Sequence, residues 1–272
     1  MCPHCRAFIT TSDKVCPYCG EHVGPRAIDL RGGTQDFLAG FIPHARFNTV
    51  LILVINFGLY IATVLYSMRS GQGNVLDIDI DTLLAFGAKF GPLIGAGQWW
   101  RLVTAGFLHG GLMHILMNSW ALFDLGAAVE EIYGTARMLV IYFVSNVTGF
   151  YLSALWNPRA PSIGASAAIC GLLGAMIGLG LRDRSSIGDA MRGTYVRWLV
   201  FIMIISLFGR IDMAAHVGGV AGGFAVAYIA GQPRLTDSRV EVLWRVASWL
   251  SILLTAVSFL AWYLWFAQAT VG

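Results

Sequence analysis

The chain has 272 residues, of which 57% are hydrophobic and only 12% are charged. Its mean hydropathy of +0.67 is too high for a soluble domain of this length, so the composition indicates an all-α, polytopic membrane protein. The net charge of +3 is modest and gives no reason to expect a nucleic-acid partner.

Four of the five cysteines lie in the first nineteen residues, as two CxxC pairs: Cys2 with Cys5, and Cys16 with Cys19. Two such pairs can present four thiolates tetrahedrally to one Zn²⁺, whereas a dithiol redox motif needs only one pair. With four sulfur ligands the metal has no open position, so we expect a structural zinc ribbon with a docking role toward a cytosolic partner, and no cofactor for catalysis.

Composition then divides the chain into four parts: the zinc ribbon over 1–24, a linker over 25–46, a membrane core over 47–232, and a loop with a last helix over 233–272. The reduced cysteines and the lack of a leading signal peptide place the ribbon in the cytosol.

Seven apolar stretches are candidates for membrane-spanning helices. They are Phe47–Met68, Leu102–Val129, Met138–Trp156, Ile163–Leu181, Val196–Gly209, Met213–Gln232 and Val246–Phe266. The fifth has only twelve uncharged residues between two arginines, so it is expected to need snorkelling or a locally thinner bilayer.

The distribution of basic residues predicts the orientation of these spans. With the ribbon inside, thirteen lysines and arginines lie on the inner side and five on the outer side. Such an excess favours a cytosolic N-terminus and, after seven crossings, a C-terminus outside, in a membrane expected to be a bacterial cytoplasmic membrane.

The fourth span carries a candidate nucleophile. Pro161 and Gly164 mark its start, which puts Ser166 in the first turn, where free backbone N–H groups and the positive helix end favour a developing oxyanion. The glycines along this span allow a neighbour to pack closely. Taken alone, a serine among small residues is better explained as a hydroxyl bonded to a backbone carbonyl.

The sixth span offers a base for that serine. It carries His216 and the pair Gly219 and Gly223 on one face, and it also descends from the outer side, so its histidine can meet Ser166 at the same depth. A hydroxyl and an imidazole on closely packed helices predict a nucleophile and its general base.

The second span adds polar groups at the same level. His114 and Asn118 are four residues apart and share one helix face, so with the Ser166 N–H they are expected to form an oxyanion hole. His109 is expected to support the preceding loop. A metal centre built from the three histidines is the alternative, but the chain has no HExxH and no carboxylate at ligand spacing.

Taken together, these segments resemble the rhomboid intramembrane serine proteases over residues 47–232. The residues that carry the resemblance are Gly97–Arg101, His109, His114–Asn118, Glu130 with Gly134 and Arg137, Gly164–Ala167, and Ala215–Gly219 with Gly223. Glu130 and Arg137 are expected to pair or to cap the turn at the inner side.

The resemblance implies a core of six helices with an appended seventh, Ser166 as nucleophile, His216 as base, and His114 and Asn118 as oxyanion donors. It implies substrates that are transmembrane segments in the lipid bilayer, cut near the outer face. Where some members have an aromatic residue one turn after the serine, this chain has Cys170.

Two other function classes compete with a protease. A rhomboid-like pseudoprotease would bind or route membrane proteins, but such relatives typically lack the serine or the histidine, and this chain has both. A transporter or metal permease would show repeated halves and broken helices, and no such repeat is visible.

Overall fold

The computed structural model describes Cys5, Ala7 and residues 15–20, 46–183, 185–208, 211–231 and 239–271. Contacts divide the chain into two compact units, 1–44 and 45–272. The described part of the second unit is helical, with no strand beyond a single bridge between Lys89 and Ser162, so the predicted all-α class is confirmed.

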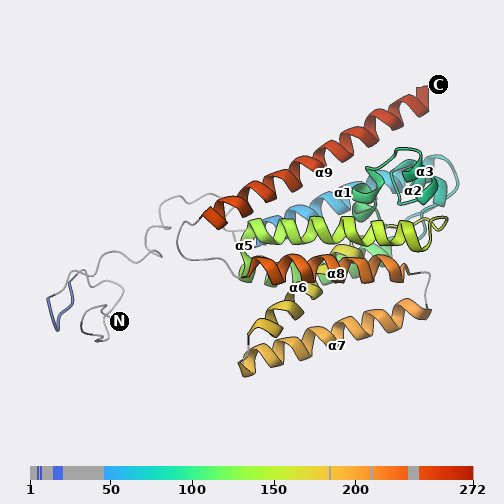
Figure 1. Cartoon of the computed structure of the whole chain (residues 1–272). Helices are drawn as coiled ribbons and strands as arrows, with labels where there is room; N and C mark the ends of the chain where they lie inside the picture. Colours follow the sequence, from blue (N-terminus) through green and yellow to red (C-terminus); the bar gives the residue numbers. More distant parts are fainter. Residues whose placement is uncertain are drawn as a thin grey trace. The chain divides into compact units, whose positions relative to one another are not determined.

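The second unit is a bundle of long helices with a group of short ones at one end (Figure 1). The long helices are α1 (Phe47–Arg69), α5 (Leu112–Trp156), α6 (Ser166–Arg182), α7 (Ser186–Phe208), α8 (Met213–Ala230) and α9 (Arg239–Val271). Between α1 and α5 lie α2 (Ile80–Ala85), α3 (Gly91–Gly95), α4 (Arg101–Thr104) and the 3₁₀ turn η3 (Ala105–Phe107).

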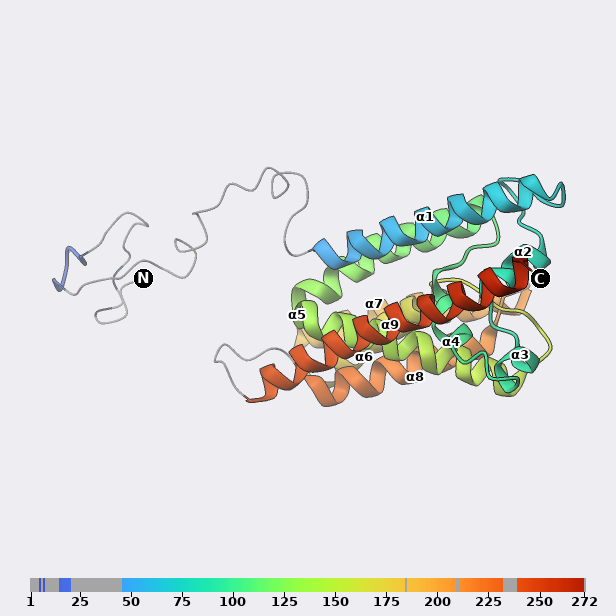
Figure 2. The same ribbon diagram turned by 90° about the horizontal axis from the view of Figure 1, so that it is seen from above.

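Helix α6 is the centre of the bundle. It packs against α5, α7 and α8, and nearly all of its residues after Ser166 are buried. Helix α7 lies at one side of the bundle, on α6, and α9 lies at the other, against α5 and α4 (Figures 1 and 2). Ser166 is therefore the first residue of the most enclosed long helix of the bundle.

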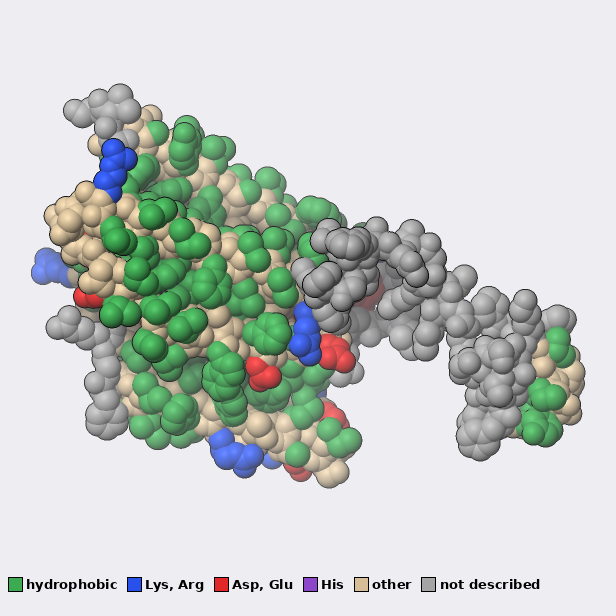
Figure 3. Space-filling view, turned by 180° about the vertical axis from the view of Figure 1, so that it is seen from behind, with side chains coloured by type: hydrophobic (Ala, Val, Ile, Leu, Met, Phe, Trp, Pro, Cys, Tyr) green, Lys and Arg blue, Asp and Glu red, His purple; other side chains and the backbone are tan. Residues whose placement is uncertain are grey.

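Five described helices are long and apolar enough to cross a membrane, and α6 is a shorter apolar helix of 17 residues. Hydrophobic side chains cover most of the helical face seen in Figure 3, and the few charged groups lie toward its edges. Apolar side chains directed outward over whole helices suit a lipid environment, and the chain is a multi-pass integral membrane protein.

Helix boundaries differ from the prediction in three places. The second and third expected spans form one 45-residue helix, α5, interrupted at Gly134, which has non-helical dihedral angles (φ 75°, ψ 162°). Because a positive φ is accessible to glycine at little cost, the chain turns there without a loop. Hydropathy found both spans but missed their junction.

The start of the second span was also predicted too early, at Leu102. Residues 101–107 form α4 and η3 instead, and α5 begins only after the pair Gly110 and Gly111. Gly111 lies against the Leu76 carbonyl oxygen, where a side chain would overlap it, so the chain is packed on the preceding loop immediately before α5 begins.

The fifth span was predicted to begin at Val196, and its helix begins earlier. Helix α7 begins at Ser186, ten residues before Val196, and has 23 residues. Its first turns carry Asp189 and Arg192, which form an ion pair of 3.1 Å and are largely exposed. The helix is therefore long enough to cross a bilayer, although Arg197 lies within it.

Candidate active site

The site lies where α6 and α8 touch through their backbones. A Cβ added at Gly219 would overlap the carbonyl oxygen of Ala167, and one at Gly223 would overlap that of Gly171. Helices approach this closely only where one partner has no side chain. The two glycines therefore set the distance between the first turns of α6 and α8.

Ser166 and His216 face each other across this contact. Ser166 is the first residue of α6, His216 lies in the first turn of α8, and Nε2 of the imidazole is 2.9 Å from Oγ of the serine. This is hydrogen-bond distance, as a hydroxyl nucleophile and its base require.

Asp212 fixes the start of α8. Its carboxylate accepts a bond of 3.0 Å from the N–H of Ala215 and another from the hydroxyl of Ser153 on α5. An N-cap of this kind satisfies a free backbone donor and ties the first turn to a neighbouring helix. The carboxylate is thus used on the backbone and on Ser153.

A second serine contacts the imidazole from α7. Oγ of Ser206 is 3.0 Å from Nδ1 of His216 and 2.7 Å from the carbonyl oxygen of Ile202. Sequence reasoning did not single out Ser206, because one serine on an apolar helix commonly bonds the carbonyl four residues before it. Only the packing of α7 beside α8 reveals its second partner.

His114 lies next to the serine on the other side. A Cβ added at Gly164 would be 2.7 Å from Nε2 of His114 and 3.6 Å from Oγ of Ser166, so the three residues are in immediate contact. Gly164 has φ +117°, which residues with a side chain rarely adopt. Both space and dihedral angle therefore require glycine here.

The tautomer of His114 follows from its other nitrogen. Nδ1 accepts a bond of 3.4 Å from the backbone N–H of Gly110. In a neutral imidazole with Nδ1 as acceptor, Nε2 carries the hydrogen. His114 consequently presents an N–H donor beside Gly164 and Ser166.

Asn118 is buried one turn further along α5. Its Nδ2 donates to the carbonyl of His114 at 3.0 Å, and the residue is 7% exposed. The amide nitrogen carries a second hydrogen, which is the group that an oxyanion would use.

His109 lies behind His114, with ring centroids 5.1 Å apart and the rings edge to face. Burial, with the nearby His114 as a second cause, lowers the pKa of His109 to about 3. His109, in the loop before α5, is thus a neutral, fully buried imidazole that packs against His114, as a supporting residue would. Within the described residues, the candidate metal cluster is formed by cysteines and not by these histidines.

The segment before Ser166 is fastened to the loop before α5. Lys89 and Ser162 exchange backbone hydrogen bonds of 2.9 and 3.0 Å, and the Lys89 ammonium donates to the carbonyls of Asn157 and Ala160. Burial lowers the pKa of Lys89, and the charge of Asp212 opposes that effect. A buried lysine is tolerated because these carbonyls replace water.

Glu130 and Arg137 were expected to pair or to cap the turn at the inner side, and they do not pair with one another. The Glu130 carboxylate accepts from the backbone N–H groups of Asn48 and Thr49 and thereby caps the start of α1. Arg137 forms a two-bond ion pair of 2.7 and 2.8 Å with Glu241 of α9. Glu130 thus bonds the start of α1, and Arg137 bonds a residue near the start of α9. The two side chains lie on opposite sides of the break at Gly134 in α5.

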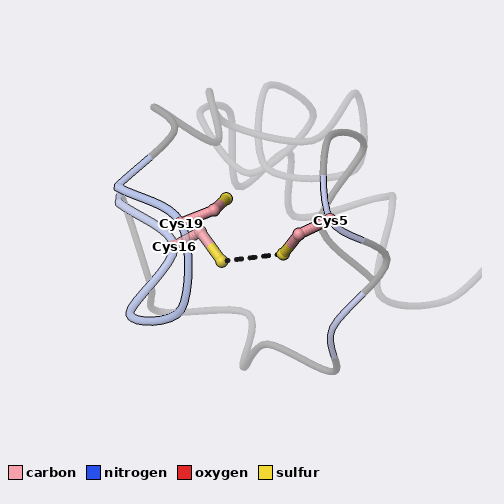
Figure 4. Close-up of side chains that lie close together, drawn as sticks. All are labelled: Cys5, Cys16 and Cys19. Atoms are coloured by element: carbon pink, nitrogen blue, oxygen red, sulfur yellow. Dashed lines mark hydrogen bonds between the residues drawn. The ribbon is translucent and has the colours of Figure 1, made fainter.

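The N-terminal unit brings three of the four expected zinc ligands together. The sulfur atoms of Cys5, Cys16 and Cys19 lie within 4.8 Å of one another, and those of Cys5 and Cys16 are 3.6 Å apart (Figure 4). Sulfurs bound tetrahedrally at about 2.3 Å from zinc would lie at about this separation. The donor set fits the metal; Cys2, the fourth expected ligand, lies outside the described residues.

Comparison with known proteins places the chain in a family. Residues 96–233 match the model of the Rhomboid domain. The chain is 43% identical over 159 residues to "Rhomboid protease GluP" of Bacillus subtilis (strain 168), which covers 57% of this chain and 30% of that protein.

Two eukaryotic relatives are more distant. The chain is 31% identical over 239 residues to "Rhomboid-like protease 1" of Toxoplasma gondii, covering 85% of this chain and 78% of the relative. It is 34% identical over 170 residues to "RHOMBOID-like protein 7" of Arabidopsis thaliana, covering 60% and 54%.

Proposed function

The chain belongs to the rhomboid family and is a peptidase, and from this premise we propose that it is a serine endopeptidase that cuts transmembrane segments of other membrane proteins. The observation that carries the proposal is the 2.9 Å contact between Ser166 and His216, inside a bundle of apolar helices. Buried polar groups are costly in a membrane unless they serve a function, and here they meet in one place.

In the proposed reaction, the Ser166 hydroxyl loses its proton to Nε2 of His216 as Oγ bonds to the carbonyl carbon of the scissile peptide. The carbonyl π electrons move to its oxygen, which becomes an oxyanion. Collapse of this intermediate breaks the C–N bond, and the leaving amine takes the proton from Nε2. A water molecule then repeats the sequence on the acyl-enzyme and releases a carboxylic acid.

The oxyanion requires donors fixed before the reaction. We assign this role to the backbone N–H of Ser166, to Nε2–H of His114 and to the Asn118 amide. The first-turn N–H of α6 has no acceptor within its own helix. His114 contacts Gly164 beside the nucleophile, and donors arranged in advance stabilise developing charge without reorganisation.

The cut is proposed near the outer face. The charge distribution favours an inner N-terminus, so both Ser166 and His216 begin helices that descend from outside. Helix α6 has 17 residues and a length of about 25 Å, less than the hydrocarbon thickness of about 30 Å. A serine at the start of such a helix lies below the membrane surface, within reach of a transmembrane substrate.

For the N-terminal unit we propose a structural zinc ion held by Cys2, Cys5, Cys16 and Cys19. The three described sulfurs support this assignment by their spacing. Bound metal would stabilise a short segment that cannot bury a core, and four sulfur ligands leave no position for a reacting group.

Cleavage by the purified protein tests the proposed function. A labelled model transmembrane substrate is incubated in detergent with the wild type, with Ser166→Ala and with His216→Ala. Each change removes a polar group that packing does not need, so both proteins should fold and neither should cleave. A fluorophosphonate, which reacts with activated serines, should label the wild type and not Ser166→Ala. Cleavage by Ser166→Ala would refute the serine mechanism, and a wild type that only binds the substrate would favour a pseudoprotease.

A further inference from the structure

The hydroxyl of Ser206 has two partners, and their chemistry assigns its one hydrogen. The carbonyl oxygen of Ile202, at 2.7 Å, can only accept. If the hydroxyl donates there, its oxygen has lone pairs left for Nδ1 of His216, at 3.0 Å. Nδ1 must then carry a hydrogen and donate it.

This assignment determines the other ring nitrogen. A neutral imidazole with hydrogen on Nδ1 has a lone pair on Nε2, the nitrogen that lies 2.9 Å from the Ser166 hydroxyl. Only this tautomer can accept the serine proton. We propose that Ser206 is a positioning residue, which holds His216 in the Nδ1–H form and orients its ring toward Ser166. The inference rests on the proposed function, which it deepens.

The opposite arrangement is disfavoured by the position of Ser206 in α7. To donate to Nδ1, its hydroxyl would have to leave the Ile202 carbonyl, which is its local acceptor within the helix. Both Ser206 and His216 are more than nine-tenths buried, so water is a poor substitute partner. The arrangement that keeps both bonds is the one that leaves Nε2 as a base.

Asp212 does not compete for this role. Its carboxylate accepts from the Ala215 N–H and from the Ser153 hydroxyl, at the cap of α8. A hydroxyl partner has a further advantage in an apolar bundle, because it accepts from the imidazolium during the reaction and adds no charge that must be buried at rest.

Kinetics provide the first test. Loss of a positioning residue should lower kcat while KM stays unchanged, since Ser206 does not contact the substrate. For Ser206→Ala we expect kcat to fall by about 10- to 100-fold, less than the whole contribution of a general base. Ser206→Thr retains the hydroxyl and its bond to Ile202, and should restore most of the rate.

The matched control is Ser258→Ala on α9. Ser258 is fully buried and bonds the carbonyl of Leu254 at 2.7 Å, the same local geometry with no histidine attached. This variant should retain wild-type kcat. A purely structural role of buried helix serines would instead slow both alanine variants alike, and that result would overturn the proposal.

The tautomer itself gives a readout that does not depend on activity. In protein with ¹⁵N-labelled histidine, the resonances of His216 are assigned by their absence from His216→Ala. The wild type should show protonated Nδ1 and unprotonated Nε2, and Ser206→Ala should show both tautomers in exchange. Unchanged His216 shifts in Ser206→Ala, or an unchanged kcat, would overturn the inference. Cleavage by Ser166→Ala would instead refute the proposed function.

Discussion

At the scale of single residues, Asn118 has the most specific expected role. Its amide donates to the His114 carbonyl with one hydrogen and has a second for the oxyanion. Asn118→Ala should therefore lower kcat by about 10²–10³-fold with little change in KM, as for other single oxyanion donors. Steady-state cleavage of the model substrate measures both constants.

The control for this change is Asn118→Asp, which has the same shape but presents oxygens only. It should be at least as slow as the alanine variant, because a carboxylate repels an oxyanion. If turnover were unchanged in Asn118→Ala, the residue would have no place in the mechanism, and its bond to His114 would be only structural.

At the scale of helices, the contact between α6 and α8 sets the geometry of the pair Ser166 and His216. Gly219→Ala adds a methyl group that would overlap the Ala167 carbonyl oxygen, one residue after the nucleophile. We expect this variant to lose both activity and several degrees of Tm, because overpacking costs about 1–3 kcal/mol and shifts the backbone. Thermal unfolding in detergent and the cleavage assay test the two effects.

Gly58→Ala in α1 is the matched control. It makes the same substitution within a helix, but a Cβ there meets nothing within 4 Å. Alanine is the better helix former, so this variant should be as active and at least as stable as the wild type. Equal behaviour of the two variants would show that backbone contact between α6 and α8 does not limit the site.

The helices also show which features could be predicted from the sequence and which could not. Each predicted apolar stretch overlaps a described helix, with the second and third sharing α5, because a segment in lipid must satisfy its backbone by forming a helix. Features set by contacts distant in sequence were missed. Glu130 caps α1 from 82 positions away, and Ser206 meets His216 only because α7 packs beside it. Ser166, His216, His114 and Gly164, which lie together in the structure, could be singled out from the sequence because helix starts and small residues have a local pattern.

At the scale of the whole molecule, the zinc unit is expected to be separate from the chemistry. The charge distribution favours the cysteines on the inner side and Ser166 toward the outer side, so we expect most of a bilayer between them. Deleting residues 1–24 should therefore leave cleavage of the model substrate unchanged in detergent, while the set of substrates cut in cells changes.

Removing the metal with a chelator tests, in the full-length chain, whether cleavage is independent of the zinc unit. A strong chelator should release one zinc ion per chain, measured by a colorimetric indicator, and the purified enzyme should remain active. Inhibition of a still folded enzyme would contradict the separation, and would require a different topology or a different active site.

Helix α9 is attached at both ends to segments that precede it. Arg137 on α5 pairs with Glu241 near its start, and Trp262 near its end donates to the Ala85 carbonyl at 2.8 Å, with its ring 5.5 Å from that of Phe86. Arg101 also lies over the Trp265 ring, at 5.2 Å. Helix α9 thus contacts the segment between α1 and α5 at Ala85, Phe86 and Arg101.

These contacts of α9 with the segment between α1 and α5 have a consequence for biosynthesis. A ribosome completes Ala85 and Phe86 long before Trp262, so these two residues lack their contacts with α9 until that helix has entered the membrane. We expect a chain ending before Arg239 to be cut by an added protease within residues 80–101, where the full chain resists; equal resistance would contradict this. The segment around Ala85 and Phe86 thus gains its contacts with α9 late in synthesis, after the residues of α5, α6 and α8 that build the site have already been made.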